Sequence, residues 1–279
     1  MNFIQAILMG IVQGLSEFLP ISSSAHLVFT SNFYKVINNI DIIQTSNEEV
    51  FFDIMAHFGT LIAVLVFFRK DIMNITVAFV KALTTKDWSS SEAKVGLYIL
   101  IGTIITILIA TPLNEVAEKL VYTPSIVGIL LFITGFVLLY SEHKSKCTNS
   151  KENDFKTSVF IGIAQGLAAL PGFSRSGWTI ATGLFMGLDR ITAAKYSFLL
   201  SIPIIFLASM GYPFVKIDLA EAASYNWPAI ICGTIASGIT GYICIKYFMK
   251  FISKFSLAIF GYYCIIMGIV TFIFFSLNN

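Results

Sequence analysis

The sequence predicts an all-α integral membrane protein, with six transmembrane helices plus two re-entrant helix pairs in an inverted-topology repeat. Of its 279 residues, 56% are hydrophobic and only 12% are charged, about half the charged share of a soluble domain. Apolar runs of membrane-spanning length recur along the chain. Two further apolar segments are interrupted midway by proline, glycine and serine, and these two segments resemble each other.

Six apolar segments reach the length of about 20 residues that a helix needs to cross the hydrocarbon core. They cover residues 50–69, 94–111, 124–141, 191–213, 226–248 and 254–277. We expect each of them to form one transmembrane helix.

The two interrupted segments are predicted to be re-entrant helix pairs, which enter and leave the membrane on the same side. The first is FIQAILMGIVQGLSEFLPISSSAHLVFTSNF, and the second centres on LPGFSRSGWT at residues 170–179. Each half is too short to span a bilayer. Non-helical backbone is tolerated at membrane depth only where protein buries it or where it lines a wet cavity.

The basic residues alternate between loops, which predicts the orientation of the chain. Residues 69–94 hold five lysines and arginines, residues 142–157 hold four and residues 246–254 hold three, whereas residues 112–123 and 214–225 hold one each. The positive-inside rule places the richer loops in the cytoplasm. Both termini are then outside, the first re-entrant pair opens from outside and the second opens from the cytoplasm.

An internal repeat relates the two interrupted segments. GIVQGLSEFLPISSSAH and GIAQGLAALPGFSRSGW share Gly-Ile-x-Gln-Gly-Leu, then Leu-Pro, then serines. Each is followed by three spans, an odd number, so the second copy enters from the opposite face. We predict a first repeat over 1–141, a cytoplasmic loop over 142–157 and a second repeat over 158–279, within one structural domain. The glycine pairs Gly10/Gly14 and Gly162/Gly166 are expected to let the two arms pack closely.

Composition also excludes several classes of protein. A net charge of +2 gives no reason to expect nucleic-acid binding. The N-terminal stretch lacks the basic region of a cleavable signal peptide. The four cysteines show neither disulfide nor metal-site spacing and are interpreted as packing residues.

The first interrupted segment carries groups that suit catalysis. Gln13 and Glu17 share a helix face, and a carboxyl group inside apolar sequence is usually functional. Three serines and a histidine follow the proline: Ser22, Ser23, Ser24 and His26. One serine serves as a helix N-cap, but the group also offers a hydroxyl nucleophile and a base. Asp53 and His57 share another helix face, and they fit either an outer layer of the site or a purely structural role.

The second interrupted segment predicts an anion site. Ser174, Arg175 and Ser176 precede a helix whose free backbone N–H groups and dipole attract anions. Arginine adds a two-pronged donor for phosphate, and Thr179 adds a hydroxyl one turn later. Arg175 also fits a structural role as the partner of Glu17. Where the two segments meet, they would hold a phosphate or diphosphate beside a nucleophile, with an apolar groove at hand for a lipid tail.

At these residues the chain resembles the undecaprenyl-diphosphate phosphatase family of the bacitracin-resistance type. The family motif (Glu/Gln)-x-x-x-Glu matches QGLSE, and the motif Pro-Gly-x-Ser-Arg-Ser-x-x-Thr matches PGFSRSGWT. The resemblance covers essentially the whole chain. It implies hydrolysis of undecaprenyl diphosphate to the monophosphate carrier lipid plus phosphate, which recycles the carrier for cell-wall synthesis. It further implies a divalent cation, Mg²⁺ or Ca²⁺, and a multi-pass place in the bacterial plasma membrane with the active site facing outward. Oligomeric state is not indicated.

With this resemblance, each motif residue receives an expected role. The residues expected to be catalytic are Glu17, Ser23, His26 and Arg175. The residues expected to bind phosphate are Ser22, Ser174, Arg175, Ser176 and Thr179. The cation is expected to be held by Glu17 and Gln13. Many members have Glu at the position of Gln13, so Gln13 binds the cation through its carbonyl or orients water instead. Two mechanisms stay open: attack by Ser23 with His26 as base, or attack by water that His26 activates.

Two other functions fit parts of this pattern. Inverted repeats with broken helices are typical of transporters, so a polyprenyl-phosphate transporter or flippase is the alternative. A transporter has no need of a hydroxyl and an imidazole beside a phosphate cradle. The histidine-nucleophile lipid phosphatases share short serine and arginine motifs, but Ala181 stands where that superfamily needs its histidine.

The lysine distribution gives a direct test of orientation. In intact cells, a cysteine introduced into residues 214–225 should react with an impermeant thiol reagent. Native Cys147, in the basic loop, should react only after the membrane is opened. Labelling of Cys147 from outside would reverse the predicted topology.

Overall fold

A computed structural model describes residues 1–37, 47–145, 151–216 and 222–277, so Cys147 lies outside the described residues. Within these ranges the regular structure is all helical, and six helices are long and apolar enough to cross a membrane. They are α3 (Asn47–Phe67), α5 (Ser91–Leu120), α6 (Pro124–Ser145), α9 (Arg190–Lys216), α11 (Trp227–Ile252) and α12 (Ala258–Leu277). The six predicted spans are therefore confirmed as helices, with α5 running on well beyond its predicted end.

Four shorter helices form two pairs at the interrupted segments. They are α1 (Phe3–Phe18), α2 (Ser23–Ile37), α7 (Phe155–Leu167) and α8 (Arg175–Phe185). A further helix, α4 (Arg69–Thr85), lies in the segment that the sequence analysis treated as a loop. That interpretation was wrong. The charged residues of the segment suggested a loop, but α4 packs against α5, where Phe79 fills the space above Gly96.

The two breaks follow from local backbone chemistry. Pro20 excludes the helical conformation at Leu19, whose ψ is 141°, so α1 ends there. Ser22 then adopts a left-handed φ of 68°, and α2 begins at the next residue. In the second break Gly172 has a φ of 103°, and a Cβ there would lie 2.5 Å from Val127 O. Glycine fits this close approach because it has no side chain.

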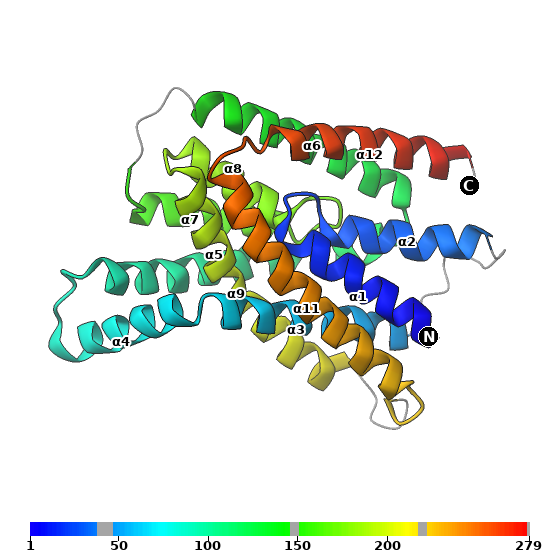
Figure 1. Cartoon of the computed structure of the whole chain (residues 1–279), viewed down its shortest axis with the longest axis horizontal. Helices are drawn as coiled ribbons and strands as arrows, with labels where there is room; N and C mark the ends of the chain where they lie inside the picture. The colour runs from blue at the N-terminus through cyan, green and yellow to red at the C-terminus, as the bar shows by residue number, and fades with distance from the viewer. Residues whose placement is uncertain (38–46, 146–150, 217–221, 278–279) are drawn as a thin grey trace.

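The ends of the helices are arranged as the predicted topology requires. The N and C marks lie at the right-hand end of the bundle, the α4–α5 connection lies at the left-hand end, and the α11–α12 connection lies left of the centre (Figure 1). The α1–α2 hairpin has its two outer ends at the terminal end, and α7 starts from the opposite end (Figure 1). This arrangement fits re-entrant pairs in an inverted repeat, which stay predictions together with the repeat boundaries.

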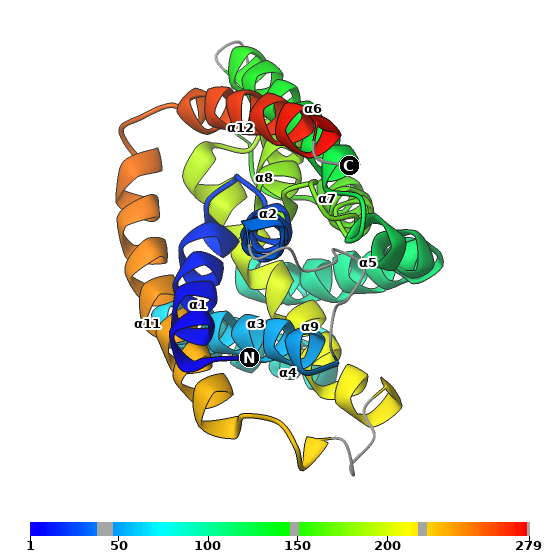
Figure 2. The same cartoon turned by 90° about the vertical axis from the view of Figure 1, so that its right-hand side faces the viewer.

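The first arm of each pair packs against a span from the other half of the chain. Helix α1 lies along α11, and helix α7 lies along α5. A Cβ on Gly10 would lie 2.1 Å from Gly233 O, and one on Gly162 would lie 2.8 Å from Gly102 O. The glycines thus seat the arms on these spans, not on one another as expected from the sequence. Seen along the bundle, α2 lies near the middle of a ring formed by α12, α6, α5, α3 and α11 (Figure 2).

We expect Gly10→Leu to destabilise the protein by about 1–3 kcal/mol, because backbone atoms of α11 occupy the space that the new side chain needs. The matched control is Gly211→Ala in α9, where a Cβ would meet nothing within 4 Å. The measurement is thermal unfolding of both variants in detergent. Equal melting temperatures would contradict the close α1–α11 contact.

Candidate active site

The two interrupted segments meet, as the sequence predicts, and three interactions join them. Ser22 Oγ donates to Phe173 O at 3.4 Å, and Ser176 Oγ donates to Leu19 O at 3.0 Å. Arg175 forms an ion pair with Glu17. The breaks therefore bring the C-terminal end of α1 and the N-terminal ends of α2 and α8 to one place.

The carboxylate of Glu17 is the centre of this junction. Its Oε1 accepts a hydrogen bond from an Arg175 guanidinium nitrogen at 2.5 Å. Its Oε2 accepts from Ser23 Oγ at 2.6 Å and from Gln13 Nε2 at 2.8 Å. The Glu17 side chain is only 5% exposed, so its charge requires these partners. The structural pairing of Arg175 with Glu17 that the sequence allowed is thus formed.

Two buried polar atoms at the junction have no hydrogen-bond partner within the described residues: Arg175 Nη1 and Gln13 Oε1. Buried polar atoms in proteins nearly always have a partner, so such exceptions point to a bound group. Arg175 Nη1 is a donor and suits an anionic oxygen. Gln13 Oε1 is an acceptor and suits a cation or a water molecule. The Arg175 side chain as a whole is 17% exposed, whereas its Nη1 is buried.

His26 is held away from Ser23 in this structure. Its Nδ1 lies 2.7 Å from Ser22 O, and its Nε2 lies 2.7 Å from the hydroxyl of Tyr263. The imidazole ring is also stacked on the Tyr263 ring. Because a carbonyl only accepts, Nδ1 carries the proton, and Nε2 of the neutral ring accepts from Tyr263. The hydroxyl of Ser23 is bonded to Glu17 instead of His26. Tyr263 is a site residue that the sequence analysis missed.

The remaining hydroxyls that were expected to bind phosphate face protein groups. Ser174 Oγ caps α8 by accepting from Gly177 N, and Ser22 Oγ accepts from Ala25 N. Thr179 Oγ1 donates to Arg175 O and contacts the hydroxyl of Ser197 at 2.6 Å. In this structure Ser22, Ser174, Ser176 and Thr179 therefore shape the two loops and fix the backbone of Arg175, and their direct contact with phosphate stays a prediction.

Helix α3 brings His57 to the same carboxylate. Its Nε2 lies 3.6 Å from Glu17 Oε2, and its Nδ1 lies 2.7 Å from Asp53 O. Of the two interpretations of the Asp53–His57 pair, this geometry favours the one that places His57 in the site.

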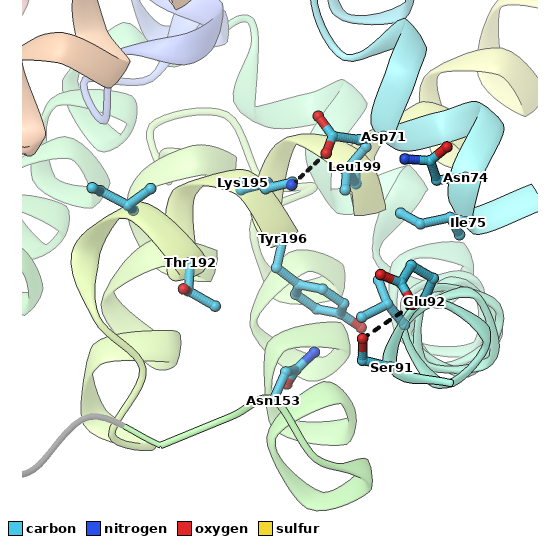
Figure 3. Close-up of a pocket in the computed structure, with 12 residues that line it drawn as sticks. Asp71, Asn74, Ile75, Ser91, Glu92, Asn153, Thr192, Lys195, Tyr196 and Leu199 are labelled. Carbon is cyan, nitrogen blue, oxygen red and sulfur yellow. Dashed lines mark hydrogen bonds and ion pairs between the residues drawn. The ribbon is translucent and has the colours of Figure 1, made fainter. Parts of the chain in front are cut away.

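Cavities also lie outside this junction. Figure 3 shows a pocket of about 450 Å³ between α4, α5 and α9, in which Lys195 points to Asp71 and Ser91 to Glu92. None of the predicted site residues lines it; Lys195 pairs with Asp71, and Glu92 accepts a hydrogen bond from Ser91. An apolar groove of about 810 Å³ begins at Leu19 and continues along Phe248, Phe251 and Phe260. It provides apolar surface beside the broken end of α1.

Comparison with known proteins gives a consistent result over nearly the whole chain. The family model described as "Bacitracin resistance protein BacA" matches residues 6–270. A protein of Methanobrevibacter smithii named undecaprenyl-diphosphatase is 41% identical over 288 residues, covering 98% of this chain and 97% of that protein. Proteins of the same name from Methanosphaera stadtmanae and Halothermothrix orenii are 39% and 38% identical, each with 98% of both chains covered. The chain therefore belongs to the bacitracin resistance protein BacA family.

Proposed function

We propose that this chain hydrolyses undecaprenyl diphosphate to undecaprenyl phosphate and inorganic phosphate. The observation that carries the proposal is the junction itself, where Arg175 keeps one nitrogen on Glu17 and leaves Nη1 free for an anion. The reaction that names the relatives, undecaprenyl-diphosphatase, needs such an anion site beside a nucleophile. We place the enzyme in the bacterial plasma membrane, with the site open to the outer face.

The diphosphate would bind at the N-terminal end of α8. Arg175 Nη1 donates to a phosphate oxygen, and the backbone at the start of α8 adds its dipole. Glu17 and Gln13 fit a divalent cation, Mg²⁺ or Ca²⁺, because both offer oxygen atoms and Gln13 Oε1 lacks a partner. When bound, the cation neutralises the diphosphate and polarises the scissile phosphate.

We propose Ser23 as the nucleophile. Its hydroxyl attacks the terminal phosphorus, the bond from that phosphorus to the bridging oxygen breaks, and undecaprenyl phosphate leaves. His26, the base expected for Ser23, is bonded to Ser22 O and to the Tyr263 hydroxyl in this structure. We therefore assign the Ser23 proton to Glu17 Oε2 in place of His26, because this oxygen accepts the hydrogen bond of Ser23. Water then cleaves the phosphoserine and releases inorganic phosphate. The charge that develops on the phosphoryl oxygens faces Arg175, where positive charge favours the transition state.

The second mechanism uses water and His26. His26 Nδ1 donates its proton to Ser22 O, so Nε2 is the basic nitrogen of the neutral ring. In this structure Nε2 accepts a hydrogen bond from the Tyr263 hydroxyl. A water molecule in place of that hydroxyl would give its proton to Nε2 and attack the phosphorus. The transporter alternative is not favoured, because transport gives no reason for a serine hydroxyl held on a buried carboxylate.

The direct test is phosphate release from undecaprenyl diphosphate by the purified protein in detergent. We expect phosphate release without additives, its loss with a chelator and its recovery with excess Mg²⁺ or Ca²⁺. A monodisperse, folded preparation that releases no phosphate under any of these conditions would reject the proposed function.

We expect Arg175→Lys to lose most activity, about 100-fold or more in kcat/KM. Lysine keeps the charge but cannot hold Glu17 and a phosphate oxygen with two nitrogens of one planar group. Arg69→Lys is the matched control, because Arg69 is exposed and donates to Val66 O, a backbone atom of the preceding helix end. Similar kinetics of the two variants would remove Arg175 from phosphate binding.

Ser23→Ala separates the two mechanisms. If Ser23 attacks, the variant should lose nearly all activity. If water attacks, the variant should lose only one hydrogen bond to the substrate, which costs about 0.5–1.5 kcal/mol and lowers the activity roughly tenfold. The measurement is kcat, together with His26→Gln and a search for phosphoserine in quenched reactions. A Ser23→Ala enzyme that keeps a tenth of wild-type kcat would leave the His26–water mechanism.

A further inference from the structure

His57 faces the Glu17 carboxylate with a nitrogen that carries no proton in the neutral ring. Its Nδ1 lies 2.7 Å from Asp53 O, and a carbonyl only accepts, so Nδ1 carries the proton. Nε2 then carries the lone pair, and it lies 3.6 Å from Glu17 Oε2. Two acceptors that face each other repel unless an electrophile lies between them.

Within the described residues, no side chain donates a hydrogen bond to both His57 Nε2 and Glu17 Oε2. Ser23 and Gln13 both donate to Glu17 Oε2, and Arg175 donates to the other oxygen. A divalent cation about 2.1 Å from each of two ligand atoms holds them about 3.0–3.6 Å apart, for angles at the metal between about 90° and 120°. The observed separation lies within this range. The His57 side chain is 33% exposed, so the position is open to an ion.

The amide at position 13 explains why a further ligand is needed. In a site with two carboxylates, the second carboxylate supplies both charge and an oxygen ligand, whereas Gln13 supplies an oxygen alone. No group of three or more His, Cys, Asp or Glu residues within the described ranges forms a complete metal cage. Cations that act on phosphates commonly use few protein ligands and complete their coordination with substrate oxygens.

We propose that His57 Nε2 and Glu17 Oε2 bind the divalent cation together, with Gln13 Oε1 as a third donor and diphosphate oxygens in the remaining positions. This inference rests on the proposed function, since it assigns the ligands of its cation. An imidazole ligand makes the site better suited to Mn²⁺ than to Ca²⁺, which prefers oxygen ligands only. Asp53 O orients the ring through Nδ1, as carbonyl groups do for many metal-binding histidines.

The test reads the metal–nitrogen bond directly. Purified protein in detergent is loaded with Mn²⁺ in the presence of methylenediphosphonate, which cannot be hydrolysed, and is examined by electron spin-echo envelope modulation. We expect a ¹⁴N coupling from a directly bound imidazole in the wild type, and a shift to the ¹⁵N pattern after ¹⁵N-histidine labelling. His57→Gln should lose the coupling and bind Mn²⁺ about 10-fold or more weakly.

Two further variants complete the design. His143→Gln changes an exposed histidine in the last turn of α6 and should keep both the coupling and the affinity. Adding Gln13→Glu to the His57→Gln variant should restore Mn²⁺ affinity without nitrogen coupling, because a carboxylate replaces the lost ligand. This restored affinity would show that the His57→Gln substitution is compatible with a folded site.

Three results would overturn the inference: bound Mn²⁺ without nitrogen coupling in the wild type, coupling that persists in His57→Gln, or no Mn²⁺ binding at millimolar concentration. In the first case a proton, and not a metal, lies between His57 and Glu17. Phosphate release from undecaprenyl diphosphate is measured on the same preparations. Active wild-type enzyme without nitrogen coupling rejects the His57 ligand alone, whereas inactive wild-type enzyme rejects the proposed function.

Discussion

The ion pair between Glu17 and Arg175 is the interaction on which the rest of the structure depends. Both charges lie among apolar helices, where an isolated charge is strongly disfavoured and the loss of one partner of a buried pair typically costs about 3–5 kcal/mol. Each charge can be satisfied only if the ends of α1 and α8 meet inside the bundle. The proline, glycine and serine breaks let them do so, because an uninterrupted helix would carry either residue past the other.

Most of the polar side chains around this pair are structural supports. Ser174 and Ser22 start helices, Ser176 ties one loop to the other, and Thr179 fixes the backbone that carries the guanidinium. Such groups satisfy backbone atoms that the helix breaks leave open. The donors and acceptors that remain for a ligand are consequently few, and they belong to Arg175, Gln13 and His57.

The sequence predicted the spans and the meeting of the two broken segments because hydropathy and helix breakers are local properties. It failed where the answer depended on partners far along the chain. Tyr263 lies 237 residues after His26, and no spacing rule connects them. The direction of each hydroxyl was equally hidden, since a serine beside an anion site and a serine capping a helix have the same local sequence. Helix α4 was missed because its charged residues suggested a loop, whereas packing on α5 stabilises it.

The packing of α1 on α11 and of α7 on α5, each a contact between the two halves of the chain, has a consequence for biogenesis. Helix α1 is made first, but α11, the span on which Gly10 closes, is made near the end of translation. Until α11 is made, α1 can pack only on α2 and α3 and lacks the helix with which it is most extensively in contact. Neither half of the chain contains a closed core, so neither has the means to assemble the site alone. A prematurely terminated chain would expose polar groups to lipid, which makes it a natural target for membrane quality control.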